Sequence, residues 1–207
     1  MVEPVCVWRY SPCMRVTGGT LGGRLLKTPK GAAVRPTQDM VRQALFSSFA
    51  ATIPGCRFLD LFAGSGAVGL EAWSRGAAYV GWVENDALAF KVLRENVETL
   101  CGPLSPRGEG SGCMTVRSDV FRFLRGELGG DPYDLVFADP PYDREGTLQW
   151  AAKLLAALSE TGVLATGGYF IMEQAEDEGE AVHFAWDVTS VKTYGGTRLT
   201  VYRKTGE

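Results

Sequence analysis

The stretch LFAGSGAVG, residues 61–69, decides the fold class of this 207-residue chain. It carries the glycine spacing Gly64-x-Gly66-x-x-Gly69 between an apolar run and an amphipathic run. Glycines at this spacing permit a tight turn from a strand into a helix and let a ligand approach the backbone closely. The spacing therefore predicts a strand–turn–helix unit that holds a cofactor. By itself it does not distinguish a dinucleotide from another cofactor.

The residues from Arg57 onward repeat this arrangement. Apolar runs of strand length alternate with amphipathic runs of helical period, which is typical of a mostly parallel sheet with helices on both faces. Near the C-terminus, two β-rich runs separated by Gly195 and Gly196 predict a closing antiparallel hairpin. We therefore expect a single α/β core over residues 53–207, which suits the chain's length and its 45% hydrophobic content.

Residues 1–52 predict a basic extension ahead of this core. RVTGGTLGGRLLKTP reads as a glycine-rich β-hairpin, and PTQDMVRQALFSSFA as a helix capped by Thr37. The apolar side of that helix is expected to comprise Met40, Ala44, Leu45 and Phe49. Residues 1–43 hold seven Lys and Arg residues against two acidic ones, in a chain whose net charge is −3. Such an arm can bind a polyanion, although a solvated basic surface is the alternative.

Cysteine usage and hydropathy exclude several classes of protein. The five cysteines form no C-x-x-C pair and are odd in number, so neither a zinc site nor a closed disulfide framework is indicated. No apolar run approaches the ~20 residues needed to cross a bilayer, and the first residues lack a signal-peptide pattern. We expect a cytoplasmic protein with no metal and no membrane partner.

Carboxylates at predicted strand ends narrow the choice of cofactor. Asp60 ends the first strand, where it would repel a pyrophosphate but would suit an ammonium or sulfonium group. S-adenosylmethionine carries both groups. Glu84 ends the second strand and can accept hydrogen bonds from ribose hydroxyls, whereas Asp119 could accept from the adenine amino group or cap the following helix. The other residues assigned to the cofactor are Phe62, Ala63, Gly64, Ser65, Gly66 and Asn85.

The segment ADPPYD, residues 138–143, predicts the chemistry. Methylation of an exocyclic amine needs acceptors that orient the amine and a flat surface that clamps the ring. Asp139 supplies a carboxylate, the Pro140 carbonyl a second acceptor, and Tyr142 an aromatic face. A general base with a raised pKa is not required, because a sulfonium is already an activated methyl donor. Positioning and stabilisation of charge would supply most of the acceleration.

Three rival functions remain open from the residues alone. An NAD-linked oxidoreductase fits the glycine spacing but conflicts with Asp60 and lacks a catalytic His or Tyr-x-x-x-Lys arrangement. A methyltransferase acting on adenine N6 in DNA, or on a protein glutamine, would use the same Asp-Pro-Pro-Tyr segment. A catalytically silent RNA-binding assembly factor is opposed by the intact Asp139.

Five segments, in order from about Met14 to Lys204, resemble the bacterial small-subunit rRNA guanine-N2 methyltransferases of the RsmD type. They are RVTGGTLGGRLLKTP, VRPTQDMVRQALFSSF, LDLFAGSGAVGLEAWSRGA, DLVFADPPY and KTYGGTRLTVYRK. The resemblance implies an S-adenosylmethionine-dependent class I (Rossmann-like) fold with a seven-stranded sheet. It also implies methyl transfer to N2 of guanine 966 of 16S rRNA, in partly or fully assembled small ribosomal subunits.

The resemblance also assigns roles to residues. It implies that Asp60, Gly64, Gly66 and Glu84 hold the cofactor, and that Asp139, Pro140 and Tyr142 hold the target base. In the arm, Arg24, Lys27, Arg35 and Arg42 are expected to contact the RNA backbone. The protein is expected to act as a monomer.

Overall fold

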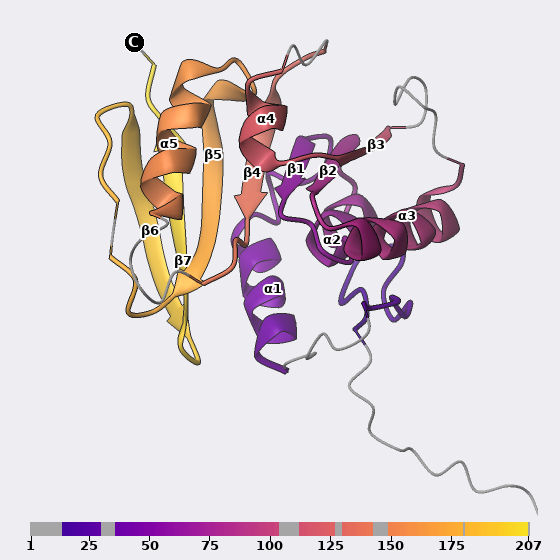
Figure 1. Cartoon of the computed structure of the whole chain (residues 1–207). Coiled ribbons are helices and arrows are strands. Elements are labelled where there is room, and N and C mark those ends of the chain that lie inside the picture. The colour runs from indigo at the N-terminus through magenta and orange to yellow at the C-terminus, as the bar shows by residue number, and fades with distance from the viewer. Residues whose placement is uncertain are drawn as a thin grey trace, which may run out of the picture.

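One seven-stranded sheet organises the computed structural model, which describes residues 14–29, 36–103, 112–126, 130–142, 149–179 and 181–206 (Figure 1). The strand order is β3-β2-β1-β4-β5-β7-β6. The strands are β1 (Arg57–Leu61), β2 (Tyr79–Glu84), β3 (Cys113–Arg117), β4 (Tyr133–Ala138), β5 (Leu164–Ala175), β6 (Trp186–Tyr194) and β7 (Thr197–Lys204). The helices are α1 (Pro36–Ser48), α2 (Ala67–Ser74), α3 (Ala87–Cys101), α4 (Val120–Leu124) and α5 (Trp150–Glu160).

The topology is that of the predicted α/β core. Strands β1 to β5 run parallel, and β7 pairs antiparallel with both β5 and β6, so the expected closing hairpin is confirmed. Strand β5 begins at Leu164, earlier than the YFIMEQA run suggested. In the ranges that the structure describes, no helix is long and apolar enough to cross a membrane.

Helices cover both faces of the sheet (Figure 1). Buried residues of α1, α2 and α3 form one apolar cluster with one face, and those of α4 and α5 form a second cluster with the other. Successive strand residues point to opposite faces. Leu59 and Leu61 therefore pack on the α4–α5 side, whereas Phe58 packs on the α1–α3 side. Asp60, between the two leucines, is directed to the α1–α3 side at the carboxyl end of β1.

The N-terminal extension packs into the same core as the sheet. Its hairpin is closed by an antiparallel bridge between Arg15 and Leu25. Helix α1 begins at Pro36, so Thr37 lies inside the helix and is not its cap. The predicted apolar side of α1 is also partly wrong, because Met40 is 53% exposed and Ala44 is only half-buried. The side chains of α1 and the adjoining turn that reach the core are Val41, Leu45, Phe46 and Phe49.

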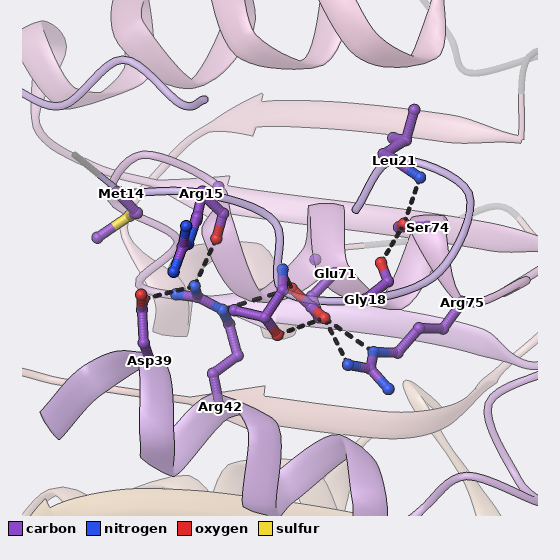
Figure 2. Close-up of polar contacts among 12 residues, drawn as sticks. Met14, Arg15, Gly18, Leu21, Asp39, Arg42, Glu71, Ser74 and Arg75 are labelled. Atoms are coloured by element: carbon purple, nitrogen blue, oxygen red, sulfur yellow. Dashed lines mark hydrogen bonds and ion pairs between the residues drawn. The ribbon is translucent and has the colours of Figure 1, made fainter. Parts of the chain in front are cut away.

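Glu71 of α2 fastens this extension to the core, as Figure 2 shows. Its side chain is fully buried, and its two carboxylate oxygens accept hydrogen bonds from the backbone N–H (2.6 Å) and hydroxyl (2.8 Å) of Thr17. Arg75, one helical turn on, pairs with it at 2.7 Å, and Arg42 of α1 lies 3.6 Å away. One buried carboxylate thus joins the hairpin, α1 and α2.

Ser74, at the end of α2, holds the tip of the hairpin. Its hydroxyl donates to the Gly18 carbonyl at 2.6 Å and accepts from the Leu21 N–H at 2.8 Å (Figure 2). A Cβ on Gly19 would lie 2.0 Å from the Ser74 carbonyl oxygen, and Gly19 has φ +75°. Gly19 is therefore required by this close approach.

Candidate active site

The glycine turn lies between β1 and α2, as the sequence predicts. Gly64 and Gly66 have φ values of +54° and +84°, and Phe62 adopts φ 61°, which side chains rarely do. Gly69 has a different role. A Cβ there would lie 2.2 Å from Trp82 Nε1, so its absence lets α2 pack directly on β2.

Carboxylates from two strands fix the shape of this turn. Asp60 Oδ2 accepts a hydrogen bond from the Gly69 N–H at 2.9 Å, and Glu84 Oε2 accepts from the Gly64 N–H at 2.7 Å. Glu84 Oε1 accepts from the Asp86 N–H at 2.7 Å. Each carboxylate oxygen has a second lone pair, so Glu84 can still accept from a ribose hydroxyl. That role stays a prediction.

The N-terminal hairpin contacts the same turn. Asn96 of α3 donates to the carbonyls of Ser65 and Lys27, both at 2.9 Å, and accepts from the Lys27 N–H. The Ser65 hydroxyl lies 3.2 Å from the Met14 sulfur. Ser65 of the turn is thus held by contacts with the hairpin residue Met14 and with Asn96 of α3.

A cavity of about 220 Å³ opens beside the turn at the carboxyl ends of the strands. Its walls come from β1, β4, β5, α1, α2 and the N-terminal hairpin. The lining residues are Met14, Thr28, Pro29, Arg42, Leu45, Asp60, Phe62, Ala63, Gly64, Ser65, Ala67, Val68, Phe137, Asp139 and Glu173. The cavity thus brings together the predicted cofactor turn, the predicted catalytic Asp139 and part of the arm.

Three carboxyl groups meet in this cavity: Asp60 and Glu173 are buried, and Asp139 is half-buried. Burial raises the pKa of Asp60 to about 8. The hydrogen bond from the Gly69 N–H lowers this pKa, and the nearby charges of Asp139 and Glu84 raise it. Burial likewise raises the pKa of Asp139 to about 7. The pKa of Glu173 is raised to about 8 by burial and by Asp139, and Arg42 opposes that rise. No group of three or more acidic, Cys or His side chains is placed to hold a metal among the residues described.

This donor set fits S-adenosylmethionine. Concentrated buried carboxylates favour a ligand with ammonium and sulfonium groups and disfavour a pyrophosphate. A Cβ on Gly64 would meet nothing within 4 Å, so the backbone at that point is open to an approaching ligand. Five of the residues predicted to bind the cofactor line the cavity and would hold S-adenosylmethionine there: Asp60, Phe62, Ala63, Gly64 and Ser65.

The other residues predicted for the cofactor lie outside the cavity. Asp119 is exposed and its Oδ1 accepts from the Arg122 N–H at 3.0 Å, so it caps α4, the alternative that the sequence left open. Asn85 is exposed, and its carbonyl accepts from Arg117 Nε at 3.5 Å. Gly66 shapes the turn without lining the cavity.

The Asp-Pro-Pro-Tyr segment follows β4, as predicted. No described residue donates a hydrogen bond to the Asp139 carboxylate, so burial alone accounts for its raised pKa. Pro140 is buried. Tyr142 is half-buried, and its hydroxyl shares a hydrogen bond of 3.1 Å with Thr197 Oγ1 at the start of β7. Tyr142 does not line the cavity itself.

The basic residues assigned to RNA do not form one group. Arg24 and Lys27 are exposed on the hairpin, with Lys27 paired to Glu95 at 3.0 Å. Arg35 lies outside the described residues. Arg42 is only 4% exposed, and its Nη2 donates to the Arg15 carbonyl and to Asp39. The expectation that Arg42 contacts RNA phosphates is therefore wrong, because its guanidinium is enclosed by α2 and the hairpin.

Glu173 lines the cavity but was not predicted from the sequence. It lies near the end of β5 in the YFIMEQA run and lines the cavity beside Asp139. The rule that selected Asp60, an acidic residue at the carboxyl end of a parallel strand, would have selected Glu173 as well. Only the order of strands in the sheet shows that β5 borders β4.

This fold and site define a class I methyltransferase, the class that uses S-adenosylmethionine. A family model described as "Conserved hypothetical protein 95" matches residues 14–203, and the chain belongs to this family. Ribosomal RNA small subunit methyltransferase D of Escherichia coli (strain K12) is 34% identical over 192 residues, covering 92% of this chain and 90% of that protein.

Two further relatives agree over nearly the whole chain. YlbH of Bacillus subtilis (strain 168) is 33% identical over 196 residues, which cover 93% of this chain and all of that protein. The solved structure of YhhF from Escherichia coli is 33% identical, with a TM-score of 0.76, and covers 94% of this chain and 99% of that one.

Proposed function

We propose that this protein transfers a methyl group from S-adenosylmethionine to the exocyclic N2 amine of a guanine in small-subunit rRNA, at guanine 966 in assembled subunits. One observation carries the proposal. Asp139, a half-buried residue whose carboxylate has no hydrogen-bond donor among the described residues, lines the same cavity as the glycine turn at Gly64. The choice of rRNA is supported by the E. coli relative, whose name specifies small-subunit rRNA.

S-adenosylmethionine supplies an activated methyl group. Asp139 accepts a hydrogen bond from the N2 amine and so aims the nitrogen lone pair along the line of attack. As the N–C bond forms, the bond between the methyl carbon and the sulfonium sulfur would break and leave neutral S-adenosylhomocysteine. Positive charge develops on N2, and the adjacent Asp139 carboxylate stabilises it. The pKa of Asp139, about 7, also allows it to take up the proton that N2 releases.

Base stacking is assigned to Tyr142. Its hydroxyl is tied to Thr197 at the start of β7, which restricts the ring and lowers the entropy cost of clamping a flipped base. The exposed cations Arg24 and Lys27 on the hairpin are assigned to the phosphate backbone.

The test is methyl transfer from labelled S-adenosylmethionine to small subunits that lack the modification, followed by nucleoside analysis. The expected product is N2-methylguanosine at one position, lost in Asp139→Asn. Naked 16S rRNA run in parallel decides whether assembly is required. Labelled N6-methyladenosine, or label in ribosomal protein, would contradict the proposal.

A further inference from the structure

We propose that Glu173 is a specificity residue that reads guanine, accepting a hydrogen bond from the N1–H of the target base while Asp139 accepts from the N2 amine. The inference rests on the proposed function, because it assigns the recognition of the base that Asp139 presents for methylation.

The sheet register places the two carboxylates side by side. Ala138, the last residue of β4, pairs with Met172 of β5, so Asp139 directly follows β4 beside Glu173 of β5. Phe137 and Ile171, two residues earlier on each strand, both pack in the cluster on the α1–α3 side. Because side chains alternate along a strand, Asp139 and Glu173 point to that same side. Both line the cavity.

The Glu173 carboxylate is buried but uncommitted. The side chain is 8% exposed, and no described residue donates a hydrogen bond to it. The carboxylate oxygens are therefore available to a donor that enters the cavity. Burial and Asp139 raise the pKa of Glu173 to about 8, and Arg42, which lines the same cavity, opposes that rise. A hydrogen bond from the guanine N1–H would favour the ionised form of Glu173, which can only accept.

Guanine matches two neighbouring carboxylates better than adenine does. Its Watson–Crick edge presents the N1–H and N2–H donors side by side, and ionised carboxylates are acceptors only. Adenine presents one amine beside a bare N1 lone pair, which a carboxylate at Glu173 would repel. A site built for a hydrogen bond rejects analogues that lack the group, because its own polar atom is left unpaired.

The experiment compares guanine with 2-aminopurine at the target position of reconstituted small subunits. 2-Aminopurine keeps the N2 amine but has a bare lone pair at N1. We expect the wild-type protein to prefer guanine in single-turnover methyl transfer by roughly 10- to 100-fold. Glu173→Gln offers an amide donor to that lone pair, so its preference should fall at least about tenfold.

Glu173→Ala and Glu176→Gln complete the set. Glu173→Ala should lower the guanine rate by removing the acceptor for N1–H, and it should not lower the 2-aminopurine rate because the repulsion of the N1 lone pair is removed, so its preference also falls. Glu176→Gln makes the same charge change at an exposed residue just beyond β5 and should keep the wild-type preference. Thermal melts confirm that each variant is folded, and 2-aminopurine fluorescence reports base binding independently of turnover.

The outcomes distinguish a failure of the specificity role of Glu173 from a failure of the proposed function. If wild type methylates guanine but the folded Glu173 variants lose rate equally on both bases, Glu173 is merely structural and the inference is overturned. If wild type methylates no guanine, the proposed function fails and this inference fails with it. A lower guanine preference confined to the Glu173 variants supports both.

Discussion

Arg42 of α1 and Glu71 of α2 form an ion pair enclosed by the protein, with Nε 3.6 Å from Oε2 and side-chain exposures of 4% and 0%. Arg42 also lines the cavity that holds Asp60 and Asp139. The N-terminal extension is therefore part of the wall of the active site as well as a covering of the sheet. Substitutions in α1 that displace Arg42 would therefore change the shape of the cavity.

Glu71→Gln should destabilise the protein strongly. Removing one partner of a buried ion pair leaves an uncompensated charge, and the typical cost in unfolding free energy is about 3–5 kcal/mol. Urea denaturation measures this cost directly. Glu95→Gln removes the same charge from the exposed pair with Lys27, and its unfolding midpoint should stay close to that of wild type. Equal midpoints for both variants would contradict the role assigned to Glu71.

The exposed cations of the hairpin should control the salt dependence of subunit binding. Changing Arg24 and Lys27 to Gln should weaken binding and reduce its dependence on log salt by roughly one unit for each phosphate that is no longer neutralised. Cofactor affinity should not change. Arg42→Gln, tested where it remains folded, should leave the slope as in wild type because its guanidinium is buried. An unaltered slope in the Arg24 and Lys27 variant would remove the hairpin from the RNA-binding surface.

Asp139→Asn should separate chemistry from cofactor binding. The change keeps a hydrogen-bond acceptor but removes the negative charge that stabilises the positive charge developing on N2, so turnover should fall by about 100- to 1,000-fold. Cofactor affinity, measured by calorimetry, should stay within a few-fold because Asp139 is assigned to the base. A parallel collapse of cofactor binding would assign Asp139 to the wrong ligand.

The buried carboxyl of Asp60 should make the ligand-free protein less stable as pH rises. Its pKa is raised from 3.8 to about 8 on folding, so the native state holds a proton that the unfolded chain releases. The stability that this proton contributes is complete below about pH 4 and is lost as pH rises through about 8. Asp60→Asn removes that contribution.

Unfolding measured from about pH 5 to about pH 8.5 tests this linkage. Asp60→Asn should lose less stability than wild type over the interval, and its cofactor affinity should be weaker because a counter-charge for the ammonium or sulfonium is gone. Parallel pH profiles for the two proteins would show that Asp60 does not change its protonation on folding.

The sequence by itself determined most of the helices and strands and the positions of the cofactor turn and of Asp139. Apolar periodicity located the parallel strands and the C-terminal hairpin, because the residue spacing of a strand or helix is local information. The glycine spacing with Asp60 placed the cofactor turn, and Asp139 followed from the Asp-Pro-Pro-Tyr segment after β4. These motifs can be recognised in the sequence because the residues of each one lie within a few positions of one another.

Tertiary structure alone decided which side chains meet. Local pattern assigned Met40 to the core and Arg42 to the RNA, but packing turned Val41 and Phe46 inward and enclosed Arg42 against Glu71. Glu173 joined the site only because β5 pairs with β4 in a register that sets it beside Asp139. The burial of a side chain, its hydrogen-bond partners and its pKa depend on residues that are distant in the chain. The pattern within one segment therefore does not predict them.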